Sequence, residues 1–382
     1  MREGGAFMTI DEAIRTLTTI QDTEYPFISL YLNTRWDNEQ QRERVRIFWK
    51  HCQANMMTKT TEGNDSRKSL EHDLKRSDSY VEHLIHQFTD TPYHGIAVFA
   101  CHALDTFLVY RSTVPFSPQF VISSRPQIRQ LVYRRNEFAR ALVVLVATDH
   151  ARIVEVQLGG ITLAKALERE VPGRHKQGGW SQMRFQRHIK DQMEHHHKEV
   201  ADEVTRLFDT ESPPYVILGG QDHILASFKR FLPERLLDKM AAVLPLDRHT
   251  PEPAIVEHVR RTLQSRQGAM EERLVSELIQ RALTHRHAVL GLHDTLRAAL
   301  NKQVYELLLS EQFSVLGWRC GHCGTLGEGS LSICTSCGTQ ANVAEVGEEL
   351  LQAVLRQGGT VNVVHHHRQL EEAGGIGALL RY

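Results

Sequence analysis

Two pairs of cysteines place the strongest constraint on how this chain can fold. Two residues separate the cysteines of each pair, about ten residues separate the pairs, and Gly324 and Gly338 directly follow them. Four thiolates at this spacing can close a tetrahedral shell around zinc, and glycine relieves the tight backbone turn at each pair. A closed shell has no open position for a substrate, so we predict a structural zinc site, with reduced free thiols or an iron–sulfur centre as alternatives. The predicted ligands are Cys320, Cys323, Cys334 and Cys337.

The length and composition indicate a globular protein of several domains. The chain has 382 residues, of which 41% are hydrophobic and 24% are charged. Because domains usually contain 50–250 residues, we expect three of them. No apolar run approaches the roughly 18 to 20 residues of a membrane span, and the N-terminus lacks the pattern of a signal peptide. We therefore expect a cytoplasmic protein without a membrane anchor.

The hydrophobic periodicity predicts an α/β fold in three parts. The first domain, residues 1–136, starts at Met1 or Met8, since Thr9 to Glu12 forms a capping box that opens a helix. Its other expected features are strands at 26–34, 96–100 and 106–110 and a loop near 58–66.

The second and third domains also alternate strands with helices. The second, residues 137–272, has expected strands at 141–147, 153–158, 161–164, 215–218 and 242–246, with one long amphipathic helix at 186–208. The third, residues 273–382, follows a connecting helix at 270–283 and has expected helices at 292–300 and 346–355, expected strands at 304–309 and 360–364, and the zinc ribbon at 318–341. The fold class is therefore α/β throughout.

One short segment concentrates positive charge. The formal net charge of −1 gives no global sign of nucleic-acid binding, so any such binding must be local. Between Pro172 and Lys190 the chain has five basic residues and no carboxylate. A solvated basic face accounts for many runs of this kind, but phosphate groups also attract such a patch. The basic residues are Arg174, Lys176, Arg184, Arg187 and Lys190.

Two histidine runs and one glycine pair have structural interpretations. The runs are residues 195–197 and 365–367. Consecutive helical positions point about 100° apart and strand positions alternate between faces, so we expect solvated histidines rather than metal ligands. Gly219-Gly220-Gln221 follows an apolar strand and opens a helix. We interpret it as an ordinary strand-to-helix turn rather than a catalytic motif.

The segment from Gly173 to Val200 resembles part of a known family. Archaeo-eukaryotic class-1 release factors carry a basic loop with Gly-Gly-Gln at the tip of the middle domain, then an Arg-Phe pair and a long helix. Here Gly178-Gly179, Arg184-Phe185 and the helix match this pattern. Trp180 stands in the place of the glutamine, and the nearest glutamine, Gln182, follows two residues later.

The resemblance extends over nearly the whole chain. Residues 292–310, the cysteine pairs after Trp318 and the ending 374–382 are similar to the last domain of the archaeal members. The first domain and the GGWSQ-type loop resemble those of bacterial relatives of these factors, including the ribosome hibernation factor Balon. The Asn-Ile-Lys-Ser stop-codon motif is missing from the polar region 51–75, which argues against codon reading.

The resemblance implies a ribosome-binding translation factor that occupies the A site and inserts the loop 173–185 into the peptidyl transferase centre. Its expected role is hibernation or translation silencing, in which the Trp180 indole stacks on a base. The last domain is expected to contact a translational GTPase such as elongation factor Tu, and the protein is expected to be monomeric off the ribosome. The expected rRNA contacts are Arg174, Lys176, Gly178, Gly179, Trp180, Gln182, Arg184 and Arg187.

Whether the protein is an enzyme stays open on the sequence. In the family, the glutamine helps to position a water against the ester of peptidyl-tRNA. The alternative is therefore a codon-independent peptidyl-tRNA hydrolase that rescues stalled ribosomes, with Gln182 as its catalytic residue. We favour the non-catalytic role, because the indole N–H of Trp180 donates a hydrogen bond but cannot accept one. A third interpretation is a Pelota-like factor that splits stalled ribosomes together with a GTPase.

Overall fold

The computed structural model divides the chain into two compact units. It describes residues 8–20, 23–35, 39–57, 64–87, 93–137, 140–157, 160–168 and 180–382. The first unit contains Met1–Asn136 together with Ala269–Tyr382, and the second contains Glu137–Gly268. The two terminal regions thus share one unit, although each has a sheet of its own. No helix in the part of the chain that the structure describes is long and apolar enough to cross a membrane.

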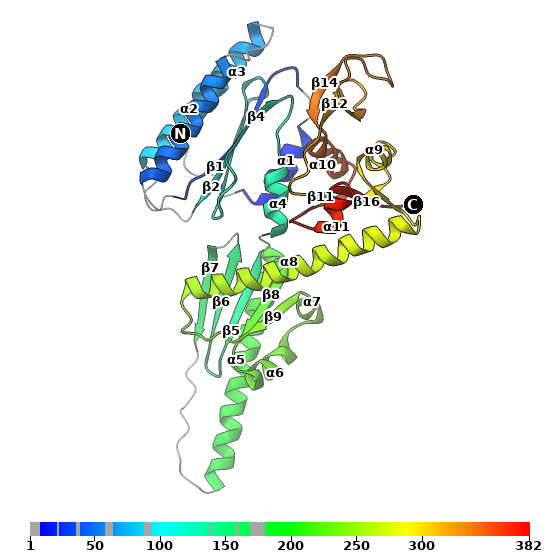
Figure 1. The fold of residues 1–382 in the computed structure, drawn as a ribbon. Coiled ribbons are helices and arrows are strands. Elements are labelled where there is room, and N and C mark those ends of the chain that lie inside the picture. The colour runs from blue at the N-terminus through cyan, green and yellow to red at the C-terminus, as the bar shows by residue number, and fades with distance from the viewer. Residues whose placement is uncertain are drawn as a thin grey trace. The chain divides into compact units, whose positions relative to one another are not determined.

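The N-terminal part of the first unit is an antiparallel sheet covered by helices. Its strand order is β3-β2-β1-β4, with β1 at Phe27–Asn33, β2 at Gly95–Cys101, β3 at Thr106–Ser112 and β4 at Gln119–Ser123. The helices are α1 (Ile10–Thr19), α2 (Glu39–Met57), α3 (Asn64–Gln87) and α4 (Arg129–Glu137). Alternate residues of β1, among them Ile28 and Leu30, pack with Trp49 of α2 and Val81 of α3 in one core. Figure 1 shows α2 and α3 beside this sheet.

The predictions for this region hold except at two places. The three predicted strands are confirmed, and so is the capping box, in which Thr9 and Glu12 exchange backbone-to-side-chain hydrogen bonds of 2.8 and 3.2 Å. Strand β4 is not predicted by the sequence. The predicted loop is too long at its C-terminal end, because α3 already begins at Asn64; residues 58–63 lie outside the described part.

The C-terminal part of the first unit has a mixed sheet and a small three-stranded ribbon. The mixed sheet has the order β10-β16-β11-β15, with β10 at Ala288–Leu290, β11 at Val304–Ser310, β15 at Thr360–Val364 and β16 at Ile376–Leu380. Strands β11 and β15 are parallel, and β16 is antiparallel to both of its neighbours. The ribbon has the order β13-β12-β14, with β12 at Leu316–Cys320, β13 at Leu326–Glu328 and β14 at Ala341–Glu345. The helices are α9 (Leu292–Leu300), α10 (Val346–Arg356) and α11 (Arg368–Glu372).

The second unit is a five-stranded sheet with helices on both faces. Its strand order is β7-β6-β5-β8-β9, with β5 at Ala141–Val146, β6 at His150–Gln157, β7 at Gly160–Glu168, β8 at Tyr215–Gly219 and β9 at Met240–Leu244. The helices are α5 (Trp180–Glu211), α6 (Asp222–Phe228), α7 (Glu234–Leu237) and the part of α8 (Glu252–Leu283) that ends at Gly268.

Strand β5 is buried on both faces because each face meets a different set of helices. Leu142 and Val144 belong to the core formed with α5 and α6, whereas Val143 and Leu145 belong to the core formed with α8. This alternation follows from the two-residue period of a strand and explains why the sequence of β5 is continuously apolar. The sequence places the start of α8 at residue 270, which is wrong: the helix begins at Glu252.

Candidate functional site

The segment predicted to bind rRNA is described only in part. Arg174, Lys176, Gly178 and Gly179 lie outside the described residues, and for Trp180, Gln182, Arg184 and Arg187 the structure describes the backbone alone. That backbone corrects one expectation, because α5 begins at Trp180 and residues 180–185 are helical rather than part of the loop. The stretch WSQMRFQR contains neither glycine nor proline and is rich in good helix formers, which accounts for the early start.

Helix α5 extends well beyond the core of its unit. Among its described side chains, the first buried one is His196, and Val200, Val204 and Leu207 then follow at helical spacing in the core. At 1.5 Å per residue, residues 180–195 span about 24 Å. Figure 1 shows this N-terminal end of α5 extending past the end of the sheet. The helix therefore holds the end of the basic segment far from the body of the second unit.

The expectation of solvated histidines is wrong for two of the three histidines in the first run, although His195 is exposed. His196 and His197 are 1% and 0% exposed, since they share the helix face of Val200. The His197 ring lies edge-on to Phe228 at a centroid distance of 5.8 Å, and burial lowers its pKa. In the second run, His365 and His366 are exposed, as predicted, but only 11% of the His367 side chain is exposed.

The Gly219-Gly220-Gln221 tripeptide is a strand-to-helix turn, as predicted. Strand β8 ends at Gly219, and Gln221 precedes the first residue of α6. Gly220 has a φ of 146°, and a Cβ at this position would lie 2.4 Å from the carbonyl oxygen of Val146. A Cβ at Gly219 would lie 2.5 Å from the Leu145 side chain. Backbone conformation and close packing therefore explain both glycines.

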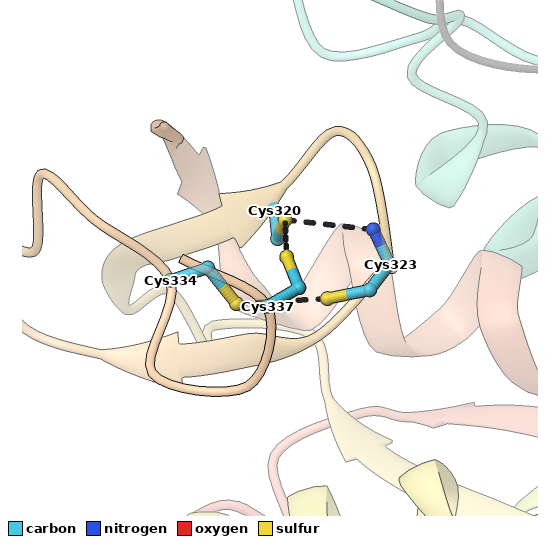
Figure 2. A group of neighbouring side chains, drawn as sticks. All are labelled: Cys320, Cys323, Cys334 and Cys337. Carbon is cyan, nitrogen blue, oxygen red and sulfur yellow. Dashed lines mark hydrogen bonds between the residues drawn. The ribbon is translucent and has the colours of Figure 1, made fainter. Parts of the chain in front are cut away.

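The four predicted cysteine ligands converge in the ribbon of the first unit. Figure 2 shows the side chains of Cys320, Cys323, Cys334 and Cys337 pointing toward one another. Their sulfur atoms all lie within 4.8 Å of one another. The Cys320–Cys337 and Cys323–Cys334 sulfur pairs are 3.4 and 3.5 Å apart. We refer to these residues as the four-cysteine cluster.

The cluster is built from two copies of one backbone turn. Both turns have the sequence Cys-x-x-Cys-Gly-Thr, at residues 320–325 and 334–339. Gly324 donates to the Cys320 carbonyl at 3.0 Å and Gly338 donates to the Cys334 carbonyl at 2.9 Å, with φ angles of 74° and 75°. Such angles favour glycine, which is why this residue follows each pair.

Two threonines beside the cluster are not among the residues predicted from the sequence. The Thr325 hydroxyl lies 3.1 Å from the Cys323 sulfur, and the Thr339 hydroxyl lies 2.7 Å from that of Cys337. Their signal in the sequence is that a threonine occupies the same position in both turns. Each hydroxyl can donate a hydrogen bond to a thiolate, which stabilises the form that binds metal.

The geometry and charge of the cluster fit a tetrahedral metal ion. Metal–sulfur bonds of 2.3 Å place tetrahedral ligands about 3.8 Å apart, which is close to the separations found here. The Cys323 amide and the Thr339 hydroxyl lower the pKa of Cys320 to about 5, so its thiolate is favoured. Cys320 and Cys334 are buried with Trp318 and Ala341 in a small core. Four protein ligands would complete the shell, which suits a structural ion rather than a catalytic one.

Comparison with known proteins finds sequence similarity to release factors. Residues 126–264 match the family model "Bacterial archaeo-eukaryotic release factor family 10". Over its whole length the chain is similar to peptide chain release factor subunit 1 of Pyrococcus abyssi, with 25% identity covering 100% of this chain and 99% of that protein. The corresponding protein of Thermococcus kodakarensis is 23% identical, over 98% of this chain and 97% of its own.

Solved structures of related factors show a weaker likeness. A crystal structure of an archaeal translation termination factor is 15% identical, covers 98% of this chain and 97% of its own, and has a TM-score of 0.26. A ribosome-bound archaeal Pelota is 15% identical, covers 99% and 95%, and has a TM-score of 0.40. Residues 126–264 thus match a bacterial family of archaeo-eukaryotic release factors, and the whole chain is similar in sequence to archaeal release factors.

Proposed function

We propose that this chain is a cytoplasmic translation factor that binds the ribosomal A site, presents residues 173–185 to the peptidyl transferase centre and silences the ribosome without hydrolysing peptidyl-tRNA. One observation carries the proposal. In a chain similar from end to end to archaeal release factors, Gly178-Gly179 is followed by Trp180, where that family has glutamine. The ribosome is thus the proposed partner, by similarity to proteins named as peptide chain release factors.

The chemistry of the segment supports binding rather than hydrolysis. An indole is bulkier than a carboxamide, and its N–H group can donate to RNA but cannot accept a hydrogen bond from a water. Stacking of an aromatic side chain on a base contributes about 1–3 kcal/mol. The basic residues around Trp180 attract phosphates, and the two glycines let the backbone approach RNA closely.

The backbone of α5 also favours binding. A helix that extends about 24 Å from its core can carry a segment into a narrow RNA cavity without unfolding. Because successive helical residues are rotated by about 100°, positions 180 and 182 lie about 200° apart around the axis. Gln182 can therefore replace Trp180 at the tip only if the first turn of α5 unwinds. The alternative, a codon-independent peptidyl-tRNA hydrolase that uses Gln182, requires this change.

A peptide-release assay separates the two functions. Ribosomes with labelled peptidyl-tRNA in the P site and an empty A site are mixed with the wild-type protein, Trp180→Ala or Gln182→Ala, and both ribosome binding and released peptide are measured. We expect no release above background from any of them, and ribosome affinity about 5- to 150-fold weaker for Trp180→Ala. Lys198→Ala, which removes an exposed charge from the same helix, is the control and should bind normally. Release that depends on Gln182 would establish the hydrolase.

The proposed GTPase partner is tested separately. By the resemblance of its last part to the archaeal factors, the chain is proposed to contact a translational GTPase, for which elongation factor Tu is the first candidate. Co-sedimentation of that GTPase with ribosomes should increase when the chain is present. A Pelota-like factor that splits ribosomes would instead convert stalled ribosomes into separate subunits on a sucrose gradient, which a silencing factor would not do.

We also propose that the four-cysteine cluster holds a structural zinc ion. The convergence of four sulfur atoms and the preference of zinc for thiolates support this assignment. Metal analysis of the purified protein should find about one zinc per chain in the wild type and close to none in Cys337→Ser. Cys52→Ser is the matched control, because Cys52 lies outside the cluster. Iron in place of zinc, with visible absorbance, would indicate an iron–sulfur centre instead.

A further inference from the structure

A second group of potential metal ligands lies where two parallel strands end. Glu311 directly follows β11, and His365 and His366 directly follow β15. Because neighbouring parallel strands end at the same edge of a sheet, these loops lie side by side, and the Glu311 amide donates to the Val364 carbonyl at 2.9 Å. A carboxylate oxygen and two ring nitrogens lie within 4.8 Å of one another. We call Glu311, His365 and His366 the histidine–glutamate cluster.

One unusual backbone angle brings the two histidine rings together. In an extended chain, adjacent side chains point to opposite faces, which is why the sequence gives no sign of a shared ligand set. His366 instead has a φ of 41°, in the left-handed region that residues other than Gly adopt uncommonly, although His, Asn and Asp adopt it more often than most. The ring centroids of His365 and His366 are therefore only 4.3 Å apart. Unfavourable angles of this kind cluster at ligand sites.

The third histidine of the run does not belong to the cluster. The Nε2 atom of His367 lies 3.0 Å from the Glu272 carboxylate, and most of the side chain is covered. The same short run thus contains two exposed rings that face a common carboxylate and one ring that pairs elsewhere. This difference provides an internal control.

Polar contacts with neighbouring side chains orient both exposed histidine rings. The Nδ1 atom of His365 contacts the Glu311 carboxylate and lies 3.2 Å from the Tyr133 hydroxyl of α4. The Nδ1 atom of His366 lies 3.2 Å from the Gln312 side-chain amide. These contacts hold the two rings beside the Glu311 carboxylate.

Negative charge also surrounds the histidine run. Three glutamates contact it: Glu311 at the His365 ring, Glu271 through the His365 amide at 3.2 Å, and Glu272 at His367. Carboxylates at this position favour binding of a positive ion, and Arg129 is a cationic group that interacts with one of them, Glu311.

We propose that the histidine–glutamate cluster binds a divalent transition-metal ion such as Zn²⁺, Co²⁺ or Ni²⁺. Two imidazoles and one carboxylate are the donors that this class of ion prefers, and bonds of 2.0–2.2 Å bring the donor atoms within about 3.5 Å of one another. Because the three side chains are exposed, rotation about their χ angles can make this adjustment. The ion ties the segment after β11 to the segment after β15, and water or an external ligand occupies its remaining positions.

The test uses the full-length protein with its four-cysteine cluster occupied by zinc, and Ni²⁺ as the probe, titrated by calorimetry. His366→Asn removes the imidazole but tolerates a positive φ, so the turn is preserved. We expect His366→Asn and Glu311→Gln to weaken the tightest Ni²⁺ site by about 10- to 100-fold or more, and His367→Ala to change it by less than about twofold. Urea unfolding of each variant checks that the fold is intact. Equal Ni²⁺ affinity in the wild type and His366→Asn would overturn the proposal, since the other histidines of the chain would then account for the binding.

Discussion

The carboxylate of Glu349 lies 3.1 Å from the guanidinium of Arg125, and only 7% and 1% of these side chains are exposed. The same oxygen of Glu349 lies 3.1 Å from Nε of Arg319, which directly precedes the cluster residue Cys320. One buried carboxylate thus connects the segment before α4, helix α10 and the ribbon within the first unit. Charged groups in such a place must be paired, because an unpaired buried charge is strongly unfavourable.

Replacing Glu349 should destabilise the first unit more than a surface ion pair would. In Glu349→Gln, the buried guanidinium of Arg125 and the largely covered guanidinium of Arg319 both lose the negative charge of this partner. We expect the free energy of unfolding to fall by about 3–5 kcal/mol. Urea unfolding followed by the fluorescence of the buried Trp318 measures this change. Asp294→Asn, which breaks an exposed pair with Arg297, is the control, and its effect should stay below about 1 kcal/mol. Equal effects of the two substitutions would contradict the prediction.

The pH dependence of stability should reveal the buried carboxyl of Glu348. Its oxygens accept from the amides of Ile128 and Arg129 at 2.6 and 3.1 Å, but burial dominates and raises its pKa from 4.5 to about 7. Between these pH values the folded chain keeps a proton that the unfolded chain has lost. The contribution of Glu348 to stability therefore falls as pH rises through this window and is constant above it.

Glu348→Gln isolates this effect because an amide does not titrate and its oxygen can still accept from Ile128. Relative to the variant, the wild type should be more stable at pH 5 than at pH 8, by at most about 3 kcal/mol. Urea midpoints of both proteins at the two pH values give the difference. Parallel pH profiles for the two proteins would show that Glu348 is ionised throughout the range.

Local patterns in the sequence predict most of the helices and strands. The features that were not predicted depend on contacts between residues far apart in the sequence. The apolar run of β5, the Thr9 capping box and the spacing of the cysteines depend on neighbours in the chain, and the structure confirms them. The short strand β4 has no strong pattern of its own and pairs along β1. The contact between Glu348 and Ile128 joins residues that are 220 positions apart in the sequence. The hydrophobic periodicity of a short segment cannot predict a contact at this separation.

The burial and grouping of the histidines could not be predicted from the sequence for the same reason. Three consecutive polar residues on a helix indicate solvent, yet His196 and His197 are buried because α5 packs against α6 at that level. The histidine–glutamate cluster depends on one φ angle at His366, and nothing in the sequence marks that angle. Residue propensities and hydrophobic patterns describe the common backbone conformations. They therefore do not predict a site that depends on an uncommon conformation at one residue.

A second pH-dependent prediction concerns His197 in the second unit. Burial lowers its pKa below the ordinary value of 6.5, so the folded chain keeps the ring neutral while the unfolded chain takes up a proton. Stability should therefore fall as pH drops below about 6.5. His197→Phe keeps an aromatic ring beside Phe228 and removes the titration, so it should lose less stability between pH 7 and pH 5 than the wild type. His195→Gln, an exposed neighbour, should retain the wild-type pH dependence.

The Gly219-Gly220-Gln221 turn gives a prediction that separates structure from function. Gly220→Ala would place a residue with a side chain at a φ of 146°, with its Cβ 2.4 Å from the Val146 carbonyl oxygen. The free energy of unfolding of the second unit should therefore fall by at least about 1–3 kcal/mol. Gln221 is exposed, and its side chain makes no capping hydrogen bond to α6. Gln221→Ala should therefore change stability by less than about 0.5 kcal/mol and leave ribosome binding unchanged. Thermal unfolding and ribosome co-sedimentation of both variants provide the measurements. A stable Gln221→Ala protein that no longer bound ribosomes would show that the turn contacts RNA. Within the folded chain, the described role of this turn is to connect β8 to α6.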